Sequence, residues 1–361
     1  MEGWEKVFIS DETFLDSIHG QQGCVNCHGG NGDLEDKEEA HEGVRREPDS
    51  LEACGQCHGE IVLGDANSLH TSLRGYNTVM QQRASPETWP HVQEAFENHC
   101  LSCHTSCGQC HVSRPTNLGG GLTSGHQFKQ VPPMNLTCTG CHGSRVEMEY
   151  KGRNEGIPAD VHWRQGGMPC FECHTQEDMH AMGDFVQDTR YDGPKQPACT
   201  DCHPDVAETG SPEHMPTHLE KLACQTCHVA DYKNCYSCHV QLSEDGVPFF
   251  QIEESVMDVK IGRNPIKSEE RPWDWVILRH APIDPNSFEY YGDNLLPNFD
   301  ERPTWLYATP HNIQHVAPQA EECNNCHGNP DVFLTEDDLR PEEVEANADV
   351  VVDEADIPAA R

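Results

Sequence analysis

Every cysteine of this chain belongs to one repeated motif, Cys-x-x-Cys-His. The twenty cysteines form ten such motifs, numbered 1 to 10 in chain order, and none is left over. The pairs are Cys24 with Cys27, Cys54 with Cys57, Cys100 with Cys103, Cys107 with Cys110, Cys138 with Cys141, Cys170 with Cys173, Cys199 with Cys202, Cys224 with Cys227, Cys235 with Cys238, and Cys323 with Cys326. Two thiols at this spacing can add to the vinyl groups of a porphyrin, and the histidine that follows can bind the iron from one side. The motif therefore predicts ten covalently attached haem c groups. Their first iron ligands are His28, His58, His104, His111, His142, His174, His203, His228, His239 and His327.

Other sites also use closely spaced cysteines, and the histidine argues against them. A zinc knuckle or an iron–sulfur cluster needs motifs that pair into sets of four ligands. A thioredoxin-like redox pair or a disulfide does not require a histidine after every second cysteine. Because all ten motifs carry that histidine, the pattern favours haem over these alternatives.

Thirteen of the 23 histidines lie outside the motifs and can supply the second axial ligand. Methionine is the rival ligand and raises the reduction potential, but the histidines suffice for ten irons, so we expect low-spin, low-potential haems with two histidines each. The local sequence favours His19, His41, His70, His99, His126, His162, His180, His218, His280 and His311 as these ligands. His91, His214 and His315 are then spare or bind a haem of a neighbouring subunit. Within the pairs His214 with His218 and His311 with His315, the assignment can also be the reverse.

The elements that must position these groups contain little conventional core. Only 35% of the 361 residues are hydrophobic, and 29 glycines and 25 prolines interrupt regular structure. Haem faces can replace much of the missing apolar side-chain surface. We therefore expect irregular coil with short α-helices, often beginning at a motif, wrapped around a chain of haems. β-structure should be scarce and lie mainly in residues 240–322.

Motif spacing suggests four segments. Residues 1–112 carry motifs 1 to 4, residues 113–239 carry motifs 5 to 9, and residues 240–330 combine a partly β insert with motif 10. Residues 331–361 form an acidic C-terminal tail, whose composition is typical of a mobile segment although its three consecutive valines are apolar enough to dock. Motifs 3 and 4 are so close in sequence that we expect their haems to be near neighbours, and motifs 8 and 9 form a second close pair.

The formal net charge of -37 disfavours nucleic acid and anionic membrane surfaces and favours basic partners or divalent cations such as Ca2+. No apolar run approaches the about 18 residues that span a bilayer. Haem attachment takes place outside the cytoplasm, so we expect a periplasmic, cell-surface or extracellular protein from which any signal peptide has been removed.

The chain resembles the multihaem cytochromes c with bis-histidinyl haems that serve anaerobic respiration and extracellular electron transfer. The resemblance covers about residues 15 to 330. It rests on Glu38-Glu39-Ala40-His41-Glu42-Gly43, Ser68-Leu69-His70, the doublet from Cys100 to His111, Gly119-Gly120-Gly121 with His126, Cys138-Thr139-Gly140-Cys141-His142-Gly143-Ser144-Arg145, and Cys224 to His239. It implies electron hopping along closely spaced haems, with other redox proteins or extracellular acceptors as partners. Both a subunit that self-associates into a filament and a discrete carrier fit this resemblance.

The alternative is a multihaem oxidoreductase of the hydroxylamine oxidoreductase or tetrathionate reductase class. Such an enzyme needs one catalytic haem with an open or lysine-ligated iron. The sequence contains no Cys-x-x-Cys-Lys motif, and its histidines suffice for every iron. We therefore assign no catalytic residues and expect an electron carrier.

Overall fold

The computed structural model describes residues 2, 5, 9, 12–101, 105–183, 185–193, 196–230, 238–252 and 258–361. Three predicted ligating positions, Cys103, His104 and Cys235, lie outside the described residues. The chain forms two compact units, each built from several stretches of sequence. Unit 1 comprises residues 1–78, 100–143 and 170–196, and unit 2 comprises residues 79–99, 144–169 and 197–361.

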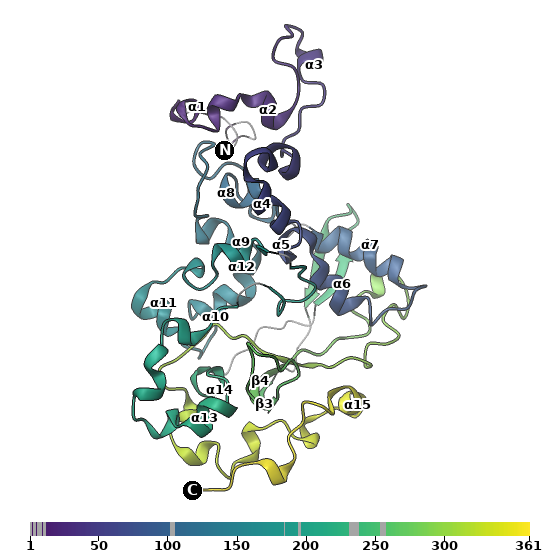
Figure 1. Cartoon of the computed structure of the whole chain (residues 1–361). Coiled ribbons are helices and arrows are strands. Elements are labelled where there is room, and N and C mark those ends of the chain that lie inside the picture. The colour runs from purple at the N-terminus through teal and green to yellow at the C-terminus, as the bar shows by residue number, and fades with distance from the viewer. Residues whose placement is uncertain are drawn as a thin grey trace. The chain divides into compact units, whose positions relative to one another are not determined.

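Unit 1 consists of short helices joined by turns (Figure 1). They are α1 (Thr13–Asp16), α2 (Cys24–His28), α3 (Lys37–Ala40), α4 (Gly55–Asp65), α5 (Leu69–Ser72), α6 (Arg74–Met80, whose last residues belong to unit 2), α8 (Cys107–His111), α9 (Cys138–His142) and α12 (Gln176–Met179). A π-helical turn, Ser50–Cys54, leads into α4, and 3-10 turns cover Gly20–Gln22, Thr116–Leu118, Met134–Leu136 and Cys170–Glu172. No strand occurs among the described residues of this unit.

Three of these helices, α2, α8 and α9, coincide with a Cys-x-x-Cys-His motif. Residues three and four apart share one face of a helix, so a single turn presents both thiols and the imidazole to the same side. The hydroxyl of Ser106 caps α8 by accepting a hydrogen bond from the backbone N–H of Gln109. Gly29 ends α2 with a φ of 76°, which a residue with a side chain rarely adopts. The prediction that short helices begin at the motifs is confirmed.

Unit 2 combines helices with all five strands of the described residues. The helices are α7 (Trp89–His99), α10 (Met148–Tyr150), α11 (Val161–Gly166), α13 (Pro216–Lys221), α14 (Gln225–His228) and α15 (Val344–Asn347). The strands are β1 (Cys238–Leu242), β2 (Pro248–Ile252), β3 (Val259–Arg263), β4 (Trp275–His280) and β5 (Trp305–Tyr307). Short 3-10 turns, among them Cys199–Asp201 and Cys323–Asn325 in motifs 7 and 10, join them.

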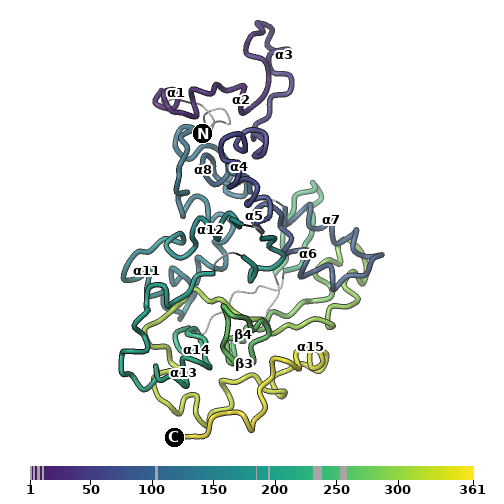
Figure 2. The backbone as a smooth tube through the Cα atoms, viewed as in Figure 1, coloured from purple at the N-terminus to yellow at the C-terminus, as the bar shows by residue number. Residues whose placement is uncertain are grey.

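The strands form two antiparallel sheets. β1 pairs with β2, and β4 lies between β3 and β5, with β3 and β4 side by side in Figure 2. Ile261 of β3 lies opposite Ile277 of β4, and Leu278 of β4 lies opposite Tyr307 of β5. The predicted fold class, mostly coil and short helices with little strand concentrated near residues 240–322, is confirmed. Wrapping of the chain around haem stays a prediction.

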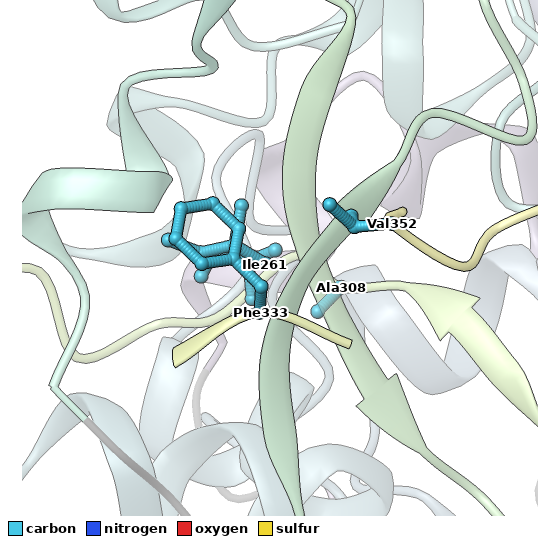
Figure 3. Packing of buried hydrophobic residues seen from close by; sticks show 5 residues of the cluster. Ile261, Ala308, Phe333 and Val352 are labelled. Atoms are coloured by element: carbon cyan, nitrogen blue, oxygen red, sulfur yellow. The ribbon is translucent and has the colours of Figure 1, made fainter. Parts of the chain in front are cut away.

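The side-chain core of unit 2 lies against the three-stranded sheet. Ile261, Ile277, Ala308, Phe333 and Val352 form one cluster in which each residue is at most 5% exposed. Figure 3 shows Ile261 and Phe333 in contact, with Ala308 and Val352 beside them. Burying an aliphatic or aromatic side chain of this kind contributes about 1.5–3 kcal/mol. Unit 2 therefore has a conventional apolar core at the sheet.

The acidic C-terminal segment packs onto this sheet. Val350 and Val352 are 2% and 1% exposed, and the backbone N–H of Val352 donates to the carbonyl of Leu334 over 2.8 Å. The carbonyl of Val350 accepts a hydrogen bond from the N–H of Arg263. The valines therefore anchor a segment whose charge alone is typical of a mobile tail. Among the described residues, no helix is long and apolar enough to cross a lipid bilayer.

Candidate functional site: paired histidines

Seven motif histidines lie opposite a histidine from another part of the same unit. In unit 1 the ring centroids are 5.9 Å apart for His28 and His126, 6.4 Å for His58 and His19, 6.1 Å for His111 and His180, and 6.3 Å for His142 and His70. In unit 2 they are 6.2 Å apart for His203 and His162, 6.0 Å for His228 and His214, and 6.2 Å for His327 and His218. Each pair joins one motif to one histidine outside the motifs.

Aromatic rings in contact have centroids about 4.5–7 Å apart, and within that range this separation also fits a metal between the rings. His19 and Phe128 do stack, and their centroids are only 3.9 Å apart. Two imidazoles that bind one metal from opposite sides have centroids about 6 Å apart, because each metal–nitrogen bond is about 2 Å long and each nitrogen lies about 1.1 Å from its ring centre. All seven pairs fall close to that value.

Hydrogen bonds at Nδ1 select the tautomer that a metal ligand needs. Backbone carbonyls accept from the Nδ1 atoms of His28 (2.8 Å), His111 (2.6 Å), His180 (3.0 Å), His218 (2.9 Å), His228 (3.0 Å) and His327 (3.2 Å). A carbonyl only accepts, so Nδ1 carries the proton and Nε2 keeps the lone pair that can bind a metal. Metal-binding histidines commonly donate their second N–H to a carbonyl or carboxylate in this way.

Two further histidines donate Nδ1–H to carboxylates. Asp160 Oδ1 lies 2.8 Å from Nδ1 of His162, and Asp178 Oδ2 lies 2.8 Å from Nδ1 of the motif histidine His174. The hydroxyl of Thr209 lies 3.2 Å from Nδ1 of His214. These hydrogen bonds orient the imidazole rings in the same manner as the hydrogen bonds to backbone carbonyls.

Burial keeps several of these imidazoles neutral. Burial lowers the pKa of His142 to about 4, with smaller contributions from His70 and His174. Burial also lowers the pKa of His70, against the opposing effect of nearby carboxylates, and lowers that of His126. Only the neutral ring has a free lone pair, so these residues are in the form that binds a metal.

The thiols show which motifs are neighbours. A hydrogen bond with Cys54 is the main cause that lowers the pKa of Cys107 to about 6, so motifs 2 and 4 are adjacent. The thiol of Cys170 is likewise the main cause that raises the pKa of Cys138.

Weaker electrostatic influences extend this set in unit 1. Cys27 acts on Cys54, and Cys110 acts on Cys138. Among the described motifs of unit 1, motif 1 is therefore near motif 2, motif 2 near motif 4, motif 4 near motif 5, and motif 5 near motif 6.

Unit 2 contains a shorter series of the same kind. A hydrogen bond with Cys199 is the main cause that lowers the pKa of Cys224 to about 7, against the opposing effect of burial. Burial raises the pKa of Cys227 to about 11, with a further contribution from Cys326. Motifs 7, 8 and 10 therefore follow one another.

Three other predicted ligands form hydrogen bonds with groups other than histidine. Nε2 of His99 forms a 2.8 Å hydrogen bond with the hydroxyl of Tyr291, and Nε2 of His280 forms one of 2.8 Å with the buried carboxylate of Glu343. His41 is exposed and donates Nδ1–H to the carbonyl of Lys37.

The remaining histidines of the sequence analysis are placed as follows. The backbone N–H of His311 donates to Glu149. Nε2 of His239 lies 3.6 Å from Asp284 Oδ2. His91 and His315 are exposed.

Of the three histidines that the sequence analysis placed outside the ten ligands, His214 lies opposite a motif histidine. It lies opposite His228, while its neighbour His218 lies opposite His327. His214 ends a 3-10 turn and His218 lies in α13, so both histidines serve different motifs instead of competing for one. The signal in the sequence was the pair itself, two histidines four residues apart.

Comparison with protein-family models, curated proteins and solved structures finds no match to this chain. Across the part of the chain that the structure describes, no three His, Cys, Asp or Glu side chains gather to hold one metal ion. A haem iron takes four nitrogens from the porphyrin and needs only two axial ligands from the protein. Pairs of histidines are therefore the donor sets that fit it.

Proposed function

We propose that this chain is a multihaem c-type cytochrome that carries electrons between low-spin haems. The observation that supports it best is the set of seven histidine pairs at 5.9–6.4 Å, each containing one motif histidine. The cysteines of each motif would hold a haem covalently, and the two histidines of a pair would be its iron ligands. Nε2 is the ligating atom wherever Nδ1 donates to a carbonyl or carboxylate.

The haem supplies reversible one-electron chemistry at iron. The chain fixes both axial ligands, holds each imidazole in one tautomer, and sets the distance between neighbouring sites. An iron with two histidines has no open position for a substrate, which favours electron transfer over catalysis. Seven sites within the described residues fit this description.

Neighbouring motifs give the route. With haem bound, the sites of motifs 1, 2, 4, 5 and 6 in unit 1 and those of motifs 7, 8 and 10 in unit 2 would be near enough to exchange electrons. This order is supported by the adjacent thiols of Cys54 with Cys107, Cys138 with Cys170, and Cys199 with Cys224. Within the described residues, motif 4 lies next to motif 2.

The protein works outside the cytoplasm, where haem is attached, and exchanges electrons with other redox proteins or extracellular acceptors. The net charge of -37 supports basic partners and Ca2+ binding over nucleic acid. Self-association into a filament and action as a discrete carrier are both compatible with the described residues.

Two measurements on the natively produced protein test the proposal. Mass spectrometry should find ten haems per chain, and electron paramagnetic resonance of the oxidised protein should show low-spin haem. Markedly fewer than ten haems would overturn the cofactor assignment. A substantial high-spin signal together with ten haems would instead support the multihaem oxidoreductase with an open catalytic haem.

A further inference from the structure

His162 and the motif histidine His174 donate their Nδ1 proton to carboxylates. Six paired histidines donate it to backbone carbonyls. His162, which faces His203 of motif 7, donates to the carboxylate of Asp160 over 2.8 Å. His174 of motif 6 donates to the carboxylate of Asp178 over 2.8 Å.

Asp160 is fixed and excluded from water. It is 2% exposed, and its Oδ1 accepts from both Nδ1 and the backbone N–H of His162 at 2.8 Å. Its Oδ2 accepts from the backbone N–H of Ile313 at 2.8 Å. Three donors therefore hold this carboxylate in one orientation against the imidazole.

Asp178 is held more simply. It lies in α12, four residues after His174, and its side chain is 14% exposed. Within the described residues its carboxylate makes no other hydrogen bond than the one to His174. The pair is therefore a direct contact between one carboxylate and one motif histidine, whose side chain is 38% exposed.

A carboxylate acceptor changes the ligand in a way that a carbonyl does not. Its full negative charge strengthens the hydrogen bond and draws the Nδ1 proton away from the ring, which makes Nε2 a stronger donor to the metal. A negative charge in a poorly solvated site also favours the iron state with the higher positive charge. Both effects favour ferric over ferrous haem.

We propose that Asp160 and Asp178 are positioning residues that lower the reduction potentials of the haem sites of motifs 7 and 6. This inference rests on the proposed function. Each site gains or loses one electron at iron while Nδ1 keeps its proton, so no proton transfer accompanies the step. The electron comes from a one-electron redox protein of the kind proposed above as partner.

The two sites have a notable place in the order of neighbours. Motif 6 ends the series 1, 2, 4, 5, 6 of unit 1, and motif 7 begins the series 7, 8, 10 of unit 2. A lower potential at one end would favour electron movement from that site toward the rest of its series.

The test is a spectroelectrochemical titration of the full haem-loaded protein and of the variants Asp178→Asn and Asp160→Asn. Each variant should raise the midpoint potential of one haem by at least a tenfold change in its reduction equilibrium, which is about 59 mV for one electron. The electron paramagnetic resonance signal of one low-spin haem should shift as well. Matched controls are Glu172→Gln, in motif 6, and Asp205→Asn, just after motif 7, which remove exposed carboxylates.

Unchanged potentials in Asp178→Asn, or shifts no larger than in Glu172→Gln, would overturn the inference. Asp160 also caps α11 and binds the backbone of Ile313, so Asp178→Asn decides the matter if Asp160→Asn does not fold. Ten low-spin haems with unmoved potentials refute only this inference, whereas an absence of haem refutes the proposed function itself.

Discussion

Replacing His214 by alanine tests the histidine pairs most directly. The imidazole of His214 lies 6.0 Å from that of His228, ring centre to ring centre, and His218, four residues on, lies 6.2 Å from His327. His214→Ala should leave the haem of motif 8 covalently attached through Cys224 and Cys227 but without its second axial ligand.

The magnitude follows from the number of motifs. One site in ten loses a ligand, so about one-tenth of the haem should change from low-spin to high-spin. His218 could move to the position left by His214, but this would not hide the effect, because the haem of motif 10 would then lose His218 as its second ligand. The fold should hardly change, since His214 is partly exposed and its side chain is held by the 3.2 Å hydrogen bond with Thr209.

The assay is quantitative electron paramagnetic resonance of the oxidised protein, with mass spectrometry to show that ten haems remain. His91→Ala is the matched control, because His91 is an exposed histidine of α7 in the same unit. His214→Met should restore a six-coordinate haem at a higher potential. Ten low-spin haems in His214→Ala, or loss of one in His91→Ala, would refute the reasoning.

Three further predictions concern stability. Phe333→Ala, in the core of unit 2, should lower the free energy of unfolding by about 3–5 kcal/mol in urea titrations. Gly30→Ala should destabilise unit 1 by more than about 1 kcal/mol in the same assay, because φ is 81° and the added Cβ would lie 2.7 Å from the carbonyl oxygen of Ala40. Gly59→Ala is the control and should not destabilise the unit, because its Cβ would have no atom within 4 Å. Burial pulls the pKa of Glu343 upward, but His280, Thr304 and the backbone of Arg340 together outweigh it and hold that pKa below its usual 4.5. The ionised carboxylate therefore contributes its full stabilisation above pH 4.5, and this contribution is lost as the pH falls through the lowered pKa. The free energy of unfolding, measured from about pH 5 to about pH 3, should fall less steeply in Glu343→Gln than in the unchanged protein.

Local features of this chain were predictable from the sequence. The motif defines its own geometry, since the two cysteines at positions one and four and the histidine at position five share one helix face, as in α2, α8 and α9. The β-prone run at residues 247–252 became β2, because branched and aromatic side chains favour extended backbone.

Pairings between distant residues were not predictable. His28 faces His126, and nothing near either residue encodes the other. Which motifs are neighbours in space was not predictable either. Motifs 3 and 4 are adjacent in sequence, yet Cys107 of motif 4 lies beside Cys54 of motif 2. Such contacts depend on how the whole unit folds, and composition does not report them.

The histidine pairs also set an order of assembly. His19, His70, His162, His214 and His218 precede their partners in the chain, so the second ligand is already present when the corresponding motif emerges. The first motif must instead wait for His126, and the fourth for His180. With the proposed haems attached during export, these two sites would pass through a stage with one axial position exposed, at which small diatomic gases could intercept the maturing protein.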